Sequence, residues 1–148
     1  MTGIRNFMTD DHRRCDDFLA EAEQALGRND TAATLTAFRQ FREAMLAHFD
    51  AEEDTLFPAF ERATGMRGGP TQVMRMEHNQ MREQLADAEQ ALAAGLLDDY
   101  AGTVGTLLIM MQQHNMKEEN ILYPMCDQHL AGDSQALLAE IQANWVPA

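Results

Sequence analysis

The fold of this chain is decided by two similar segments, HFDAEEDTLFP at residues 48–58 and HNMKEENILYP at residues 114–124. Both fit the pattern H-x-x-x-E-E-x-x-L-[FY]-P, and their histidines are 66 positions apart (114 − 48 = 66). The same offset relates two earlier dipeptides, Asp11-His12 and Glu77-His78. Self-similarity at a fixed spacing is typical of a repeated structural unit. We therefore interpret the chain as an internal duplication.

Each copy has the pattern of a helical hairpin. Apolar residues recur at every third or fourth position, the spacing of a helix that buries one face, and no stretch alternates with a period of two. We predict a single all-α domain over 1–148, with the copies at about 8–64 and 74–130. Four helices with short connections favour an up-down-up-down four-helix bundle. A short fifth helix, starting near Ser134, has no counterpart in the first half.

Local signals also predict where the helices begin and which side chains face inward. Thr9, followed by two aspartates, has the features of a helix start, because a hydroxyl caps the first turn and acids favour the positive end of the helix dipole. In the fourth helix, the spacing predicts an inner stripe made of Leu107, Met111, His114, Glu118 and Ile121. Pro58 and Pro124 are expected to kink or redirect their helices.

A histidine and a glutamate four residues apart lie about one turn apart on one helix face. Imidazole nitrogen and carboxylate oxygen are both ligands for transition metals. Two such pairs, each with a further histidine 36 residues upstream, supply enough ligands for two metal ions that share carboxylates. The candidate metal ligands are His12, His48, Glu52, His78, His114 and Glu118.

A single histidine on an apolar helix face is more often a hydrogen-bonded core residue than a ligand. Here each of the four helices carries one, and a buried glutamate is costly unless it is paired or bound to a metal. The midpoints of the histidine pairs fall in the predicted turns, so each pair lies at one height in the bundle. The sequence therefore favours a metal site, while a passively preserved duplication remains the competing interpretation.

Several nearby residues are interpreted as lying outside the ligand set. Glu53 and Glu119 follow the candidate glutamates but point about 100° away, which favours solvated positions or positions beside the ligands. For Tyr123 there are two interpretations, a contact or hydrogen bond at the site and a core role, and its counterpart Phe57 in the first copy favours the core role. Met74 is interpreted as core packing. His129 has no counterpart in the first copy and is excluded from the site.

The overall charge narrows the class of partner. The chain has a formal net charge of −13, which argues against nucleic acid and against an anionic membrane surface. The longest apolar run covers only residues 107–111, and no signal peptide is visible at the start. We therefore expect a cytoplasmic protein.

These motifs resemble the hemerythrin-like (HHE cation-binding) family of four-helix bundles, over about residues 8–126. The resemblance implies two non-haem iron ions with an oxo or hydroxo bridge, although manganese or a mixed pair would satisfy the same ligands. One metal would take His12 and His48, and the other would take His78 and His114. The two candidate glutamates would bridge the metals.

The chain departs from the oxygen-carrying hemerythrins in two ways. Their third helix carries H-x-x-x-H, where this chain has Met74 in place of the first histidine. Their last helix spaces its histidine and aspartate by five, whereas here Glu118 follows His114 by four. The missing histidine would leave each metal with about five ligands and an open position, which weakens the case for simple oxygen transport.

We expect a small molecule such as O₂, NO or peroxide as the ligand, bound, sensed or consumed at the centre. An oxidoreductase that consumes peroxide or NO, an iron storage or handling protein, and a bundle without metal are the alternatives. The sequence leaves the oligomeric state open.

Overall fold

A computed structural model describes residues 3–145, so the predicted domain range of 1–148 extends beyond the described residues at both ends. Every regular element in the described residues is helical. The elements are α1 (Ile4–Gly27), α2 (Thr31–Ala51), η1 (Glu52–Leu56), α3 (Phe57–Thr64), α4 (Pro70–Ala93), α5 (Leu97–Lys117), η2 (Glu118–Leu122), α6 (Tyr123–His129) and α7 (Ser134–Asn144). The segments η1 and η2 are π-helical.

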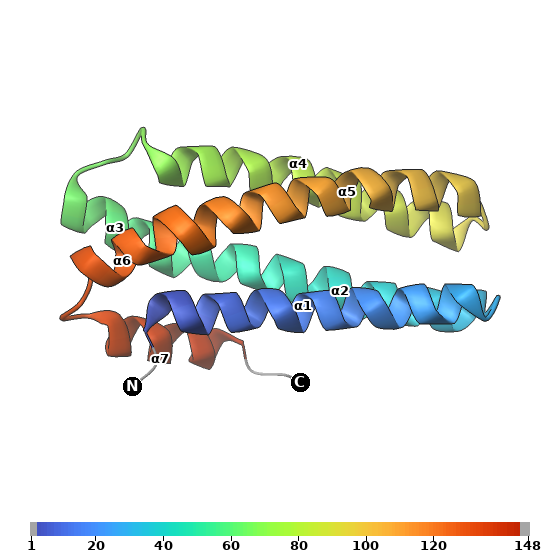
Figure 1. The fold of residues 1–148 in the computed structure, drawn as a ribbon, viewed down its shortest axis with the longest axis horizontal. Helices are drawn as coiled ribbons and strands as arrows, with labels where there is room; N and C mark the ends of the chain where they lie inside the picture. Colours follow the sequence, from blue (N-terminus) through green and yellow to red (C-terminus); the bar gives the residue numbers. More distant parts are fainter. Residues whose placement is uncertain (1–2, 146–148) are drawn as a thin grey trace.

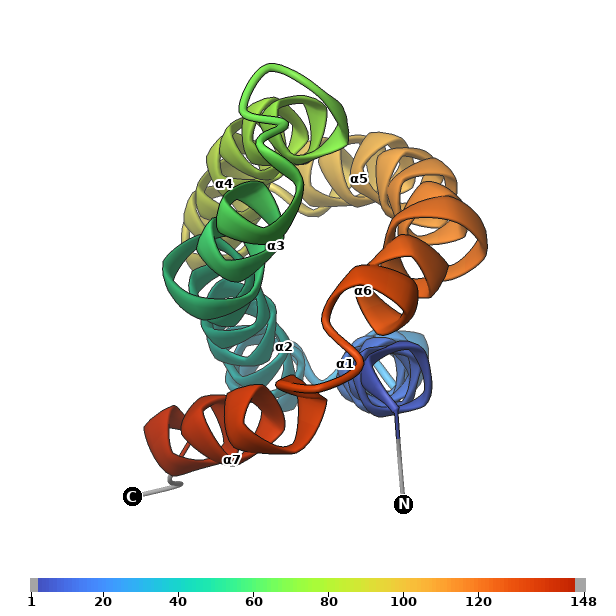
Figure 2. The ribbon, with the colours of Figure 1, turned by 90° about the vertical axis from the view of Figure 1, so that its left-hand side faces the viewer.

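The helices form an up-down-up-down bundle, as predicted. The segments α2, η1 and α3 run on as one helix, and α5, η2 and α6 form another, with α1 packed on α2 and α4 on α5 (Figure 1). Seen from one end, the four long helices surround a common axis, and α7 lies outside this ring (Figure 2). The short fifth helix, α7, packs on α1 and η1.

The first helix begins earlier than its local sequence indicates. The predicted start near Thr9 is wrong, because α1 begins at Ile4 and has no side-chain cap of its own. Instead, the carboxylate of Asp127 in α6 accepts hydrogen bonds from the backbone N–H groups of Ile4 (2.8 Å) and Arg5 (3.2 Å). Gly3 permits this approach, since a Cβ there would lie 3.0 Å from Asp127 Oδ1. A residue distant in sequence thus supplies the cap that satisfies these backbone donors.

The π-helical segments η1 and η2 begin at Glu52 and Glu118, two of the candidate ligands. In each, a backbone N–H bonds to the carbonyl five residues earlier: Phe57 to Glu52, and Tyr123 to Glu118. Pro58 directly follows Phe57, and Pro124 directly follows Tyr123. Because proline has no backbone N–H, each π-turn lies where the regular series of helical hydrogen bonds is already interrupted.

This π-turn changes which residues face inward. In a straight α-helix, a residue five positions after a glutamate points about 140° away from it, at 100° per residue. A π-turn of about 4.4 residues reduces that angle to roughly 50°. The predicted inward position of Ile121 is therefore wrong: Ile121 is 56% exposed, whereas Leu122 and Tyr123 are buried.

Two apolar clusters fill the bundle, with a polar layer between them. The first lies among α1, α2, α4 and α5 towards the turns, and includes Phe38, Phe41, Leu85 and Leu107. The second includes residues of α3, α6 and α7, together with Met8 and Met74. Along each long helix, the candidate histidine lies between residues of the two clusters. The histidines therefore share one level of the bundle. The pair midpoints predicted a common height within each hairpin, and the structure shows that the two pairs also lie level with each other.

We expect Asp127→Ala to destabilise the protein, because the start of α1 loses its cap. A lost helix cap typically costs about 1 kcal/mol, which corresponds to a fall in Tm of roughly 2–4 °C for a domain of this size. Thermal unfolding followed by circular dichroism measures the change. Glu43→Ala, at an exposed position inside α2, is the control, and an equal Tm for the two variants would contradict the role of Asp127.

Candidate metal centre

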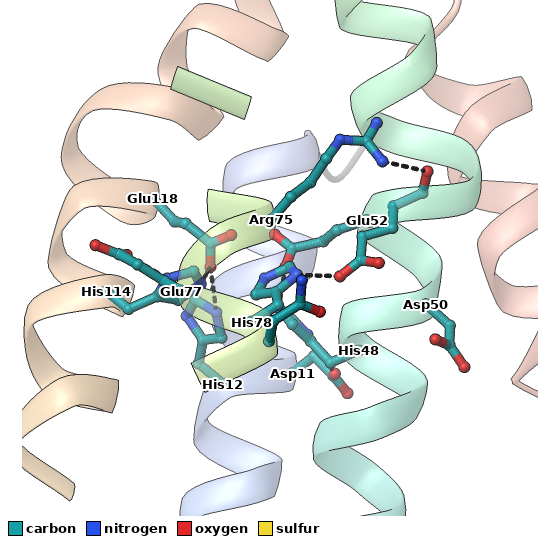
Figure 3. A network of polar contacts seen from close by, with 12 residues as sticks. Asp11, His12, His48, Asp50, Glu52, Arg75, Glu77, His78, His114 and Glu118 are labelled. Carbon is teal, nitrogen blue, oxygen red and sulfur yellow. Dashed lines mark hydrogen bonds and ion pairs between the residues drawn. The ribbon is translucent and has the colours of Figure 1, made fainter. Parts of the chain in front are cut away.

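The six candidate ligands converge at the polar layer. They come from all four long helices, and their side chains point towards one another (Figure 3). Each is between 0% and 5% exposed to solvent. The fold thus brings together every residue that the sequence predicted as a metal ligand.

The four histidines form two pairs, each within one hairpin. The rings of His12 and His48 have centroids 4.6 Å apart, and those of His78 and His114 are 4.9 Å apart. Donor atoms within 4.8 Å of one another form two groups, and Glu118 belongs to both. The first group is His12, His48 and Glu118, and the second is Glu52, His78, His114 and Glu118.

The two inner carboxylates connect the histidine pairs. Glu52 Oε1 lies 3.4 Å from His48 Nε2, one turn away on its own helix, and 3.1 Å from His78 Nε2 in the other hairpin. Glu118 Oε1 lies 3.3 Å from His114 Nε2 and 3.1 Å from His12 Nε2. Each glutamate therefore contacts one histidine of each pair, the placement that a bridging carboxylate requires.

Four further carboxylates orient the imidazole rings. The Nδ1 atoms lie 2.6–2.8 Å from carboxylate oxygens. The pairs are His12 with Glu119, His48 with Asp11, His78 with Glu53, and His114 with Glu77. Because an ionised carboxylate only accepts, the proton lies on Nδ1, and the Nε2 lone pair of a neutral ring is left for a metal.

The sequence analysis predicted the direction of two of these four orienting carboxylates but did not identify the other two. Glu53 and Glu119 point away from the inner cluster, as predicted, and contact the histidines of the other hairpin from behind. The role of Asp11 and Glu77 was missed. The signal for it was present, because each directly precedes a histidine and the two are 66 positions apart. Fixed spacing of an acid beside a ligand is the pattern of a metal site with oriented imidazoles.

The centre as built requires positive charge. When each neutral imidazole donates its Nδ1–H to an outer carboxylate, its Nε2 lone pair faces an oxygen of Glu52 or Glu118. Both groups are then hydrogen-bond acceptors and repel each other unless a cation lies between them. Of the buried side-chain atoms that lack a hydrogen-bond partner among the described residues, four belong to the centre: Glu52 Oε1, His78 Nε2, His114 Nε2 and Glu118 Oε2. Unpaired buried polar atoms are costly. Their convergence fits a bound metal ion.

Protons supply this charge when no metal is bound. Burial lowers the pKa of His12, but the hydrogen bond and charge of Glu118 outweigh it and raise the pKa to about 9. Burial also opposes the shift at His114, where the charge of Glu118 raises the pKa to about 9. Burial and the charge of Glu118 raise the pKa of Glu52. A metal ion would displace the imidazole protons, so metal binding releases protons.

The side chain of Tyr123 belongs to the centre, the interpretation that the sequence left open but favoured less than a core role. Its hydroxyl lies 2.7 Å from Glu52 Oε2 and 2.9 Å from Glu118 Oε1. Burial, followed by the charges of the two glutamates, raises its pKa well above the usual value, so the phenol is neutral and donates. The counterpart Phe57 favoured a core role, and α-helical periodicity, which takes no account of a π-turn, also points Tyr123 away from Glu118.

The other residues considered lie away from the centre. Met74 is buried in the second apolar cluster, consistent with core packing. His129 is exposed, with its ring against the edge of Phe60 at 6.0 Å. His129 belongs to neither group of clustered donor atoms.

Fold and site together define a class of protein: a helical bundle whose buried histidine and glutamate cluster could hold metal ions. The family model for the hemerythrin HHE cation binding domain matches residues 3–126, and the chain belongs to this family. No match was found among curated proteins or among solved structures. Within residues 3–145, no helix combines the length and the apolar character needed to cross a membrane.

We expect Asp11→Asn to weaken metal binding, because the amide no longer fixes the Nδ1–H tautomer of His48. Loss of such an orienting carboxylate typically costs roughly 10- to 100-fold in metal affinity. Competition with a chelator of known affinity measures the change. Asp10→Asn, at the neighbouring exposed position, is the matched control. Equal affinity in the two variants would show that Asp11 does not support the site.

Proposed function

We propose that the chain binds two non-haem iron ions in this centre, one between His12 and His48 and the other between His78 and His114. Glu52 and Glu118 bridge them. The observation that carries this proposal is that each buried carboxylate contacts one histidine of each pair. Mixed imidazole and carboxylate donors suit iron, and manganese or a mixed metal pair is compatible with the same ligand set.

The function we infer is binding of, or reaction with, a small molecule such as O₂, NO or peroxide. Burial of all six proposed ligands supports a ligand of only a few atoms, because a larger one would have to displace packed helices. Bound iron would supply Lewis acidity and electron exchange between its ferrous and ferric states. Apolar clusters on both sides of the centre exclude bulk water, and the outer carboxylates hold the rings in place.

Removing one histidine of either pair tests the proposed ligand set. We expect His48→Ala and His114→Ala to lower the iron content from about two per chain, because each removes a protein ligand from a different metal. Elemental analysis after anaerobic reconstitution measures this content. His129→Ala is the control, since that histidine lies on the surface. Full iron content in both site variants would exclude these residues as ligands.

The spectrum and reactivity of the loaded protein test the function. We expect anaerobically purified protein to contain about two irons and to develop near-ultraviolet oxo-bridge absorption on exposure to air or peroxide. Catalytic loss of peroxide or NO would identify an oxidoreductase, stoichiometric binding would identify a carrier or sensor, and transfer of iron to an apo-acceptor would identify an iron-handling protein. Absence of iron and manganese after reconstitution would refute the proposal.

A further inference from the structure

The hydroxyl of Tyr123 contacts an atom of four proposed ligands at once. Its oxygen lies 3.2 Å from the Nε2 atoms of both His12 and His48, in addition to its contacts with Glu52 and Glu118 at 2.7 and 2.9 Å. Tyr123 is completely buried. The phenol oxygen therefore lies among the ligand atoms of the half of the centre that contains His12 and His48.

In the metal-bound centre, where the imidazole Nε2 atoms carry no proton, hydrogen bonding alone does not account for this position. A phenol owns one proton, whereas all four neighbours act as acceptors when the histidines donate from Nδ1. Donors at adjacent corners of an octahedron lie about 3.0 Å apart when each is about 2.1 Å from the metal. The four distances to Tyr123 Oη, from 2.7 to 3.2 Å, match that separation. The oxygen is thus placed as one more donor around a shared metal ion.

The other half of the chain provides an internal comparison, because Phe57 lies 66 positions before Tyr123. The ring of Phe57 lies 5.8 Å from that of His78, as the ring of Tyr123 lies 5.7 Å from that of His12. Phe57 has no oxygen to place among the ligands. The same position relative to the second histidine pair is therefore without a protein donor.

The unpartnered atoms of the centre lie around that missing oxygen. The residues contacted by Tyr123 are His12, His48, Glu52 and Glu118, and an offset of 66 relates them to His78, His114, Glu118 and Glu52. One atom of each of these counterparts has no hydrogen-bond partner among the described residues. The difference between Phe57 and Tyr123 therefore separates a completed half of the centre from an open half.

We propose that Tyr123 ligates the metal held by His12 and His48, and that the metal held by His78 and His114 carries the open position where a small molecule binds in front of Phe57. This inference rests on the proposed two-metal centre. Ligation displaces the phenol proton to solvent, as metal binding does for other protonated ligands. In the oxygen-carrying hemerythrins the additional histidine is on the third helix, whereas here the additional donor comes from the last helix of the bundle.

The electronic spectrum of the ferric protein tests the tyrosine ligand. We expect a visible phenolate-to-iron charge-transfer band, with tyrosinate modes in the resonance Raman spectrum. Tyr123→Phe abolishes both while at least one iron remains bound. Tyr100→Phe is the matched control, because Tyr100 is the other tyrosine of the chain, is buried in the first apolar cluster and lies outside the centre. This variant leaves band and iron content unchanged.

Azide is the probe for the open position. We expect one azide to bind per wild-type ferric centre, and Phe57→Tyr to weaken that binding at least tenfold, because a second phenol fills the position. The exchange variant Phe57→Tyr/Tyr123→Phe moves the phenol to the other metal without changing composition. It regains the charge-transfer band and binds azide on the His12 and His48 side.

The outcomes separate this inference from the proposed function. Wild-type protein without two metals per chain refutes the function, and the inference with it. Two irons without tyrosinate modes, or modes that survive Tyr123→Phe, overturn only the tyrosine ligand. If Tyr123→Phe does not load, Phe57→Tyr still decides the open position. Azide affinity unchanged in Phe57→Tyr places the small-molecule site elsewhere.

Discussion

The interior of this protein depends on neutralising two carboxylates, Glu52 and Glu118, that are fully buried between apolar clusters. An isolated buried carboxylate is strongly unfavourable, and two of them near each other add repulsion. The four imidazoles surround the carboxylates and supply positive charge as protonated rings or through a metal ion. Packing on both sides fixes the level at which this polar layer lies, so the apolar core and the centre determine each other.

Pairs of adjacent residues contribute both the candidate ligands and the carboxylates that orient the histidine rings. In each of the dipeptides Asp11-His12, Glu52-Glu53, Glu77-His78 and Glu118-Glu119, one residue points into the inner cluster and the other contacts the Nδ1 of a different histidine. Adjacent helical residues diverge by about 100°, which allows one pair to reach two partners. Arg14, Arg82 and Lys117 bind three of the outer carboxylates, so the orienting groups are themselves held in position.

The sequence predicted much of this arrangement because its signals are local and repeated. Helical periodicity gave the all-α bundle, and the 66-residue offset identified the six residues that converge. Prediction from the sequence failed where two contacting residues are far apart in the chain or where a helix departs from α-helical geometry. The cap from Asp127 cannot be inferred from the residues near Ile4. Periodicity alone cannot show a π-turn, so it predicts Ile121 inside the bundle and gives no support to a contact of Tyr123 with the site. Pro58 and Pro124 indicated where the helices depart from regular geometry, but not that a π-turn forms there.

The pairing of histidines within hairpins has a consequence for the order of assembly. His12 and His48 are brought together by the α1–α2 turn, and His78 and His114 by the α4–α5 turn, so each pair depends on contacts between neighbouring helices. Such contacts form faster than those between distant parts of a chain. The glutamates of η1 and η2 reach across to the opposite hairpin only when the hairpins dock. We infer a folding sequence in which two half-sites form independently and docking joins them.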